Sequence, residues 1–246
     1  MHQIRRSILL LCCLVGLGCL VSNSGKAQPV EPITILNLGD GSLVKAPLEL
    51  TALVQPGADD LVRVALVDRQ GDLLARQVVR MNAPQQDTVE FITQLAFEIP
   101  GENTAASLSV TTLDHAQRPI AVRTVGLTLL SAGDVKIEPT VFSDPWLMIA
   151  QPEPGTVINT SPLVVIGQVT PINDNPVIFS LVNERGGAIV ARQLTVETPG
   201  EPIDFEISMP FTPTSAVRQM RLIIRQASRI NGVNAILDSL LLTIEP

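Results

Sequence analysis

Hydrophobic and polar residues alternate along many short segments of this chain. In residues 62–67, Val62, Val64 and Leu66 occupy every second position, and residues 219–225 repeat the same alternation. A period of two is typical of a β-strand with one buried face, and a core between two sheets requires it of every strand. No stretch sustains the 3.6-residue period of an amphipathic helix. The pattern therefore predicts an all-β protein.

Turn-forming residues separate these segments. Residues 68–72 and 183–187 each join two apolar stretches and contain the glycine that a tight hairpin favours. Pro47 and Pro162 stand just before apolar segments, where a missing backbone N–H is tolerated. Each half of the chain then yields about seven short strands, a spacing that favours a sandwich or barrel.

The chain contains this pattern twice, at a separation of about 115 residues. The corresponding segments are 41–44 and 155–158, 46–48 and 161–163, 74–77 and 190–193, 89–91 and 203–205, and 127–129 and 242–244. Each copy has the length of an ordinary sandwich domain. We expect two tandem domains, residues 31–130 and 146–246, joined by a linker of residues 131–145 that is rich in Gly, Pro and charge.

Residues 1–27 resemble an export signal. Arg5 and Arg6 precede an apolar run, and Ala27 ends a small-residue stretch suited to cleavage before Gln28. Two alternatives stay open: Cys19 follows a Gly-Leu-Gly stretch that loosely resembles a bacterial lipoprotein site, or the segment stays attached as a membrane anchor. The expected location is outside the cell or in the cell envelope, either as a free protein or as a lipoprotein.

The second copy resembles a bacterial immunoglobulin-like domain family associated with spore germination. The resemblance rests on a Pro-x-x-Gly turn in residues 152–157, on Ser-Pro-Leu and a strand ending at Gly167 in residues 161–167, and on the closing residues 240–244. It covers residues 147–245, and the first copy is a more divergent repeat, with Ala52 in the place of Gly167. The resemblance implies two immunoglobulin-like sandwiches in an exported bacterial protein and supplies no catalytic residues.

Residues that carry catalysis are scarce after the signal. His2 lies inside it, so His115 is the one remaining histidine, and Cys12, Cys13 and Cys19 lie inside it as well. The G-x-S-x-G context of a nucleophilic serine is absent from the sequence, and a His- or Cys-based metal site would need more ligands. We expect no enzymatic activity and no cofactor.

The charge of the exported part is strongly negative. The chain has 17 basic and 24 acidic residues; without Arg5, Arg6 and Lys26 of the signal, 14 and 24 remain, a net charge of −10. This charge disfavours nucleic acid and anionic lipid surfaces as partners. Contact with a membrane is expected only through an N-terminal anchor or lipid.

The sequence offers candidates for two kinds of ligand site. Asp59, Asp60 and Asp174 occupy matching loops of the two copies and are weak calcium candidates, because hard cations bind loop carboxylates. The competing interpretation, ordinary solvated turns, is favoured. Trp146 could stack on a sugar, although burial at the junction of the domains is favoured.

The predicted function is that of a non-catalytic binding module at the bacterial cell envelope, with an unidentified protein or envelope partner. One alternative is a membrane-tethered scaffold or spacer. The least favoured alternative is a calcium-dependent or sugar-binding accessory module.

Overall fold

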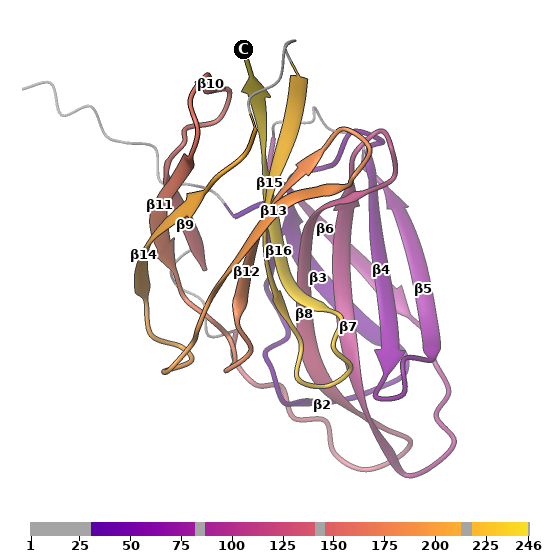
Figure 1. Cartoon of the computed structure of the whole chain (residues 1–246). Coiled ribbons are helices and arrows are strands. Elements are labelled where there is room, and N and C mark those ends of the chain that lie inside the picture. Colours follow the sequence, from indigo (N-terminus) through magenta and orange to yellow (C-terminus); the bar gives the residue numbers. More distant parts are fainter. Residues whose placement is uncertain (1–30, 82–86, 141–145, 213–217, 246) are drawn as a thin grey trace, which may run out of the picture.

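The computed structural model describes residues 31–81, 87–140, 146–212 and 218–245 as sixteen strands without any helix (Figure 1). The strands are β1 (Ile33–Ile35), β2 (Ser42–Lys45), β3 (Leu48–Val54), β4 (Leu61–Asp68), β5 (Leu73–Arg80), β6 (Val89–Leu95), β7 (Asn103–Leu113), β8 (Pro119–Leu130), β9 (Leu147–Gln151), β10 (Val157–Ile158), β11 (Leu163–Val169), β12 (Val177–Asn183), β13 (Ala188–Leu194), β14 (Ile203–Met209), β15 (Arg218–Ala227) and β16 (Asn234–Ile244). Within these four ranges no helix is long and apolar enough to cross a bilayer. The predicted all-β class is confirmed, whereas the signal segment and Cys19 lie outside the described residues.

Two sandwiches with the same strand order make up the described part of the chain. In the first, a sheet β1-β3-β6 faces a sheet β2-β8-β7-β4-β5; in the second, β9-β11-β14 faces β10-β16-β15-β12-β13. Strand n of the first sandwich therefore corresponds to strand n + 8 of the second. This shared topology agrees with the repeated sequence pattern.

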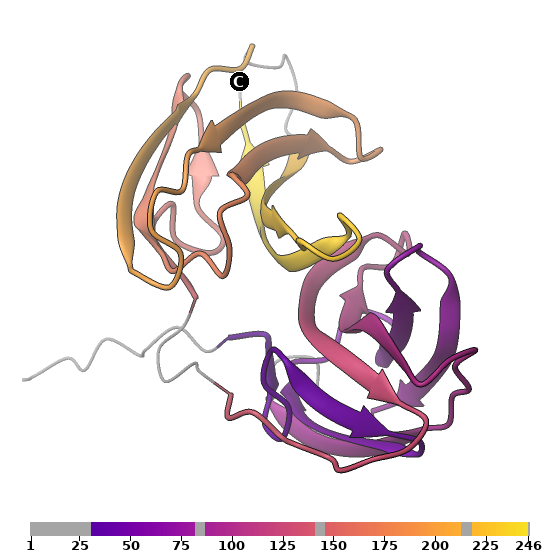
Figure 2. The same cartoon turned by 90° about the horizontal axis from the view of Figure 1, so that it is seen from below.

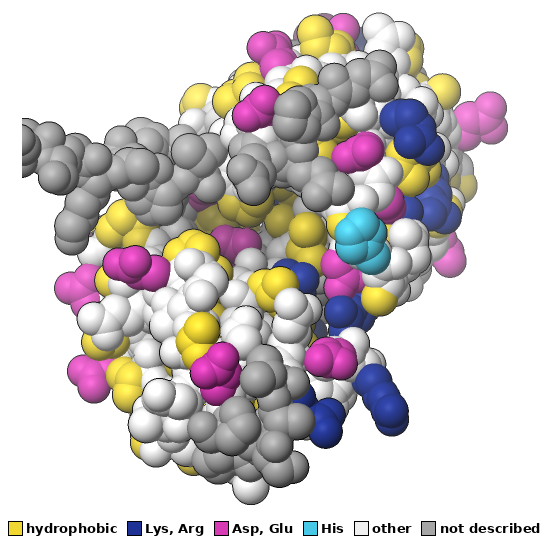
Figure 3. All heavy atoms as spheres, turned by 90° about the horizontal axis from the view of Figure 1, so that it is seen from above, with side chains coloured by type: hydrophobic (Ala, Val, Ile, Leu, Met, Phe, Trp, Pro, Cys, Tyr) yellow, Lys and Arg dark blue, Asp and Glu magenta, His cyan; other side chains and the backbone are white. Residues whose placement is uncertain are grey.

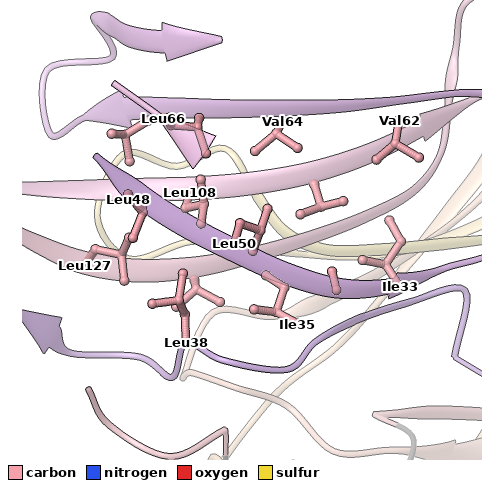
Figure 4. Packing of buried hydrophobic residues seen from close by; sticks show 14 of the residues in the cluster. Ile33, Ile35, Leu38, Leu48, Leu50, Val62, Val64, Leu66, Leu108 and Leu127 are labelled. Carbon is pink, nitrogen blue, oxygen red and sulfur yellow. The ribbon is translucent and has the colours of Figure 1, made fainter. Parts of the chain in front are cut away.

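The alternating residues build a separate apolar core in each sandwich. Val62, Val64 and Leu66 of β4 are fully buried and pack against the other sheet of the first sandwich (Figure 4). In the second core, the rings of Phe179 and Phe205 meet edge to face, 4.9 Å apart. Such geometry is favoured by the ring quadrupoles and fixes the distance between the two sheets.

The two sandwiches meet at strands β8 and β16. Arg123 and Val122 of β8 pair antiparallel with Ile236 and Leu237 of β16, so that the two larger sheets form one ten-stranded sheet. Figure 2 shows this junction from below, with yellow β16 of the second sandwich beside pink β8 of the first. The orientation of the sandwiches is thereby tied to a shared ladder and not to a linker alone.

Part of the expected linker lies along the first sandwich. Leu43 and Lys136 exchange two backbone hydrogen bonds of 2.7 and 3.0 Å, and the backbone N–H of Glu138 donates to Ser42 Oγ at 3.0 Å. Residues 131–140 thus extend the surface of the first sandwich, and residues 141–145 lie outside the described part. Backbone pairing of this kind leaves little trace in side-chain composition.

Gly167 of β11 and Ala52 of β3 occupy corresponding positions of the two copies, and the strand pairing explains why the residues differ. The pairing of β11 with β9 shifts between Ile166 and Gly167, and a Cβ at Gly167 would lie 2.1 Å from the carbonyl oxygen of Met148. In the first copy β3 pairs with β1 without such a shift, with Ala52 opposite Ile35. A side chain therefore fits in the first sandwich and not in the second.

The substitution Gly167→Ala is expected to lower the free energy of unfolding by about 1–3 kcal/mol, because the new methyl group must push a backbone strand away. Chemical denaturation monitored by circular dichroism would measure the change. Gly101→Ala is the matched control, since a Cβ there meets nothing within 4 Å. Equal stabilities of the two variants would contradict the close approach described here.

Candidate functional site

Asp59, a calcium candidate of the first copy, is held by contacts within the protein. Asp59 accepts a hydrogen bond from Arg63 Nη2 at 2.9 Å, and the backbone N–H of Leu61 and the side chain of Gln117 donate to the same carboxylate. Burial alone would raise the pKa of Asp59, but these hydrogen bonds and the Arg63 charge lower it overall. Asp60 has a left-handed backbone with φ of 55°, which suits a tight turn.

The candidate of the second copy is paired in a similar way. Asp174 Oδ1 lies 2.9 Å from Arg229 Nε, and both side chains are mostly exposed. The described residues contain no group of three or more His, Cys, Asp or Glu side chains placed to hold a metal ion. Calcium binding at Asp59, Asp60 and Asp174 therefore stays a prediction without a ligand set in the described part of the chain.

A buried ion pair lies where the sandwiches join. Glu31, just before β1, accepts a hydrogen bond of 3.0 Å from Arg123 Nη2 of β8, and the two side chains are only 9% and 6% exposed. The other carboxylate oxygen of Glu31 accepts the backbone N–H of Trp146, which opens the second sandwich. Burial raises the pKa of Glu31, although the Arg123 charge and the Trp146 N–H act in the opposite direction.

Trp146 itself is part of the second core. Its side chain is 3% exposed and packs with Leu147 and the other core residues of the second sandwich. The expectation that it is buried near the junction is confirmed. A buried indole cannot stack on a sugar, so the reason for a sugar site at Trp146 is removed.

Hydrogen bonds extend this junction in both directions. Arg118 Nη1 of the β7–β8 turn donates to the carbonyl oxygen of Glu184 in the β12–β13 turn. Thr124 Oγ1 donates to the carbonyl oxygen of Asn234 at 2.8 Å, and Ser239 Oγ donates to that of Ile120 at 3.0 Å. Specific polar pairs therefore contribute to the contact between the sandwiches, and their directionality favours one angle.

A pocket of about 330 Å³ opens beside this junction. Its charged or titratable lining comes from Asp114 and His115 of the first sandwich and from Arg221 and Asp238 of the second. Arg221 Nη1 donates to Ser239 Oγ at 2.9 Å, and its buried Nε has no hydrogen-bond partner within the described residues. Convergent polar groups in a pocket between domains are typical of a ligand-binding site.

Asp238 is the unusual group of this pocket. Burial is the main cause that raises its pKa to about 6, and the nearby Glu31 charge adds to the effect, against the backbone N–H of Ser239 and the charge of Arg221. Asp114 differs: burial would raise its pKa, but hydrogen bonds from Arg118 and from the backbone lower it overall. Two carboxyl groups of one pocket thus differ in protonation near pH 5, a pattern found at functional sites.

None of the residues Glu31, Arg123, Arg221 and Asp238 was singled out from the sequence, whereas the sequence candidates Asp59 and Asp174 do not line this pocket. The sequence pattern could have revealed Asp238, because this residue occupies an inward position of β16. Other inward positions of that strand are occupied by Ile236 and Leu242. A charged residue at such a position indicates a special environment. Glu31 offered no such signal, because it precedes the first strand.

Comparisons with known proteins do not give a family. No family model matches the chain, and no curated protein matches it significantly. The resemblance of residues 147–245 to the spore-germination family stays a prediction, although the sandwich fold that it implies is confirmed.

Three solved structures show distant likeness. Dimeric latent PorU from Porphyromonas gingivalis is 7% identical with a TM-score of 0.27, over 87% of this chain and 24% of that one. The calcium-binding domain CBD12 of CALX1.1 is 10% identical with a TM-score of 0.22, over 75% and 77% of the two chains. The collagen adhesin of S. aureus is 8% identical with a TM-score of 0.14, over 86% and 91%. Scores of this size carry no information on function.

Replacement of Glu31 by Gln is expected to lower the free energy of unfolding by about 3 kcal/mol, because it removes the carboxylate that faces a buried guanidinium. Differential scanning calorimetry would measure the loss. The matched control is Arg229→Gln, which breaks an ion pair whose side chains are 60% and 62% exposed and should cost less than about 1 kcal/mol. Similar losses in both variants would mean that the buried pair is no more important than a surface pair.

Asp238→Asn is expected to change the pH dependence of stability. The folded pKa of about 6 exceeds that of an unfolded aspartate, so the native state loses stability as the pH rises from about 4 to above 6. The variant lacks this loss and should be about 1–2 kcal/mol more stable than the original protein at pH 7.5, since Asp238 keeps partial contact with solvent. Below about pH 4 the two proteins should be equally stable.

Urea denaturation between pH 4 and 8 would measure these differences. Asp134→Asn, at an exposed position of residues 131–140, serves as the control and should follow the original protein at every pH. A stability difference that is the same at all pH values would contradict the titration of Asp238.

Proposed function

We propose that this chain is an exported, non-catalytic binding module of the bacterial cell envelope, in which two immunoglobulin-like sandwiches act as one rigid unit. The observation that carries the proposal is the continuous ten-stranded sheet, closed by the buried contact of Glu31 with Arg123 and Trp146. A ladder and a buried ion pair hold two domains at a fixed angle, as a binding surface made by both domains requires.

Open strand edges give this unit places where a partner could bind. Within the ten-stranded sheet, β5 pairs only with β4 and β13 only with β12, so one side of each strand is free of ladder partners among the described strands. Leu73 and Val78 of β5 are 57% and 44% exposed, and Ile189 of β13 is 39% exposed. An exposed edge with apolar side chains can accept a strand from another protein.

A membrane-tethered scaffold or spacer is the second candidate. The fixed junction of the sandwiches favours it, because a spacer must keep a defined length. The two candidates differ at the N-terminus: a free module would begin at Gln28 after cleavage, and a tethered scaffold would begin at a lipid-modified Cys19 or keep its anchor.

Intact mass of the protein isolated from its own bacterium would test the proposal. We expect the mass of a chain that begins at Gln28, in the soluble exported fraction, and no change of fraction in a Cys19→Ser variant. A shift of that variant from the membrane to the soluble fraction would instead establish the tethered scaffold. Protein that stays inside the cell would contradict both candidates.

The binding role is tested in the same cells with a photo-crosslinking residue at Leu73 or Ile189. We expect both edge positions to capture an envelope protein, and purified chain added in excess should compete for that capture. A crosslinking residue at exposed Asp134 is the matched control. Equal capture at all three positions would contradict a specific binding edge.

A further inference from the structure

Charged side chains are divided between the sheets. The strands of the ten-stranded sheet contain all lysines and arginines found in strands, among them Arg63, Arg76, Arg221 and Arg225. The strands of the two three-stranded sheets contain acidic residues and no lysine or arginine. Those acidic residues are Glu49, Glu90, Asp204 and Glu206.

Strand register places five arginines on the outer face of the ten-stranded sheet. Cross-strand partners lie on the same face of a sheet, and one row of partners runs Val78–Arg63–Thr111–Val122–Leu237–Arg225 from β5 to β15. Arg76 and Arg80 lie two positions from Val78 along β5, and Arg221 lies four from Arg225, so all share this face. In Figure 3, the visible Lys and Arg side chains lie in the right half of the view.

Three of these arginines are available to a partner. Arg76, Arg80 and Arg225 are exposed, and none forms an ion pair with a residue in the described ranges. In contrast, Arg63 is held by Asp59 and Arg221 by Ser239. An accumulation of free positive charge is unexpected in a chain whose exported part has a net charge of −10.

The outer face of the sheet β9-β11-β14 carries the opposite charge. A shallow hollow of about 520 Å³ there has an apolar floor that includes Met148, Ile166 and Gly167, with Asp204 and Glu206 beside it. An arginine has an apolar stem and a guanidinium that pairs with carboxylates, so this hollow fits such a side chain.

We propose that this chain binds a second copy of itself, with the exposed arginines of one ten-stranded sheet resting on the acidic face of the sheet β9-β11-β14 of the next copy. The same chain carries both complementary faces, which favours a second copy over an unrelated acidic partner. Since the two faces differ, each contact leaves one face of each kind free. Contacts of this heterologous type produce rows of molecules when they do not close into a ring.

Sedimentation velocity of the purified exported chain would test the proposal. At about 20 mM salt we expect assembly that grows with protein concentration, and at about 0.5 M salt we expect the monomer, because ions screen exposed charges at that concentration. The double variant Arg76→Glu, Arg225→Glu removes the basic face, and Asp204→Lys, Glu206→Lys removes the acidic face. Each variant alone should be at least about ten-fold weaker in self-association, which corresponds to about 1.4 kcal/mol.

Mixing the two variants gives the decisive result. For this mixture the faces are neutralised and not reversed, with Arg76→Gln, Arg225→Gln in one variant and Asp204→Asn, Glu206→Gln in the other. The first keeps its carboxylates and the second keeps its arginines, so the mixture should form a 1:1 dimer that grows no further. The control variant Arg69→Glu, Arg185→Glu changes the charge equally at two exposed turns and should assemble like the original chain. A mixture of the two charge-reversed variants should instead form longer assemblies, because the introduced Glu and Lys residues create a second complementary pair of faces.

Several outcomes would overturn the proposal. One is an original chain that stays monomeric at about 200 μM in low salt, which would put any self-association at a free energy weaker than about −5 kcal/mol. Another is a mixture of the two variants that shows no dimer. A third is a monomeric chain that binds poly-glutamate through Arg76 and Arg225, which would assign the basic face to a different acidic partner.

Discussion

The arrangement of this protein depends on one buried ion pair. Glu31 and Arg123 lie almost out of contact with water, and Glu31 also accepts the first backbone N–H of the second sandwich. Removing two charges from water is costly, and attraction between them offsets that cost only when the geometry is favourable. The Trp146 N–H thereby ties the start of the second sandwich to a residue of the first. We infer that the pair selects one orientation, even though it adds little net stability.

This orientation determines what the surface can do. Because β8 and β16 share a ladder, two ordinary sandwich sheets become one sheet with arginines on its outer face from β5 to β15. The acidic three-stranded sheets lie on the opposite sides of the two cores. With a flexible junction, the basic and acidic surfaces would adopt many relative positions. With a fixed one, they form two defined faces on a single body.

Much of the fold could be predicted from the sequence, and the reason is the strict alternation of strand residues. Val62, Val64 and Leu66 are all fully buried, and Trp146 packs in the core, as the pattern indicates. The position of residues 131–140 could not be predicted, because Lys136 pairs with Leu43 through backbone atoms that every residue has. For the junction, Arg123 is the one charged residue of β8, and its partner Glu31 precedes the first strand, so no sequence pattern connects the two.

The candidate sites could not be predicted because they depend on residues that differ between the two copies. Comparison of the two copies in the sequence reveals only the residues that they share. Both copies keep the buried phenylalanine of β6 and β14, Phe91 and Phe205, since each core needs it. At the neighbouring outward position, Ile92 of the first copy corresponds to Glu206 of the second. The outer face of β14 therefore has two exposed carboxylates, Asp204 and Glu206, where β6 has only Glu90. Duplication preserved the core that folds the domain and left the outer faces free to acquire separate roles.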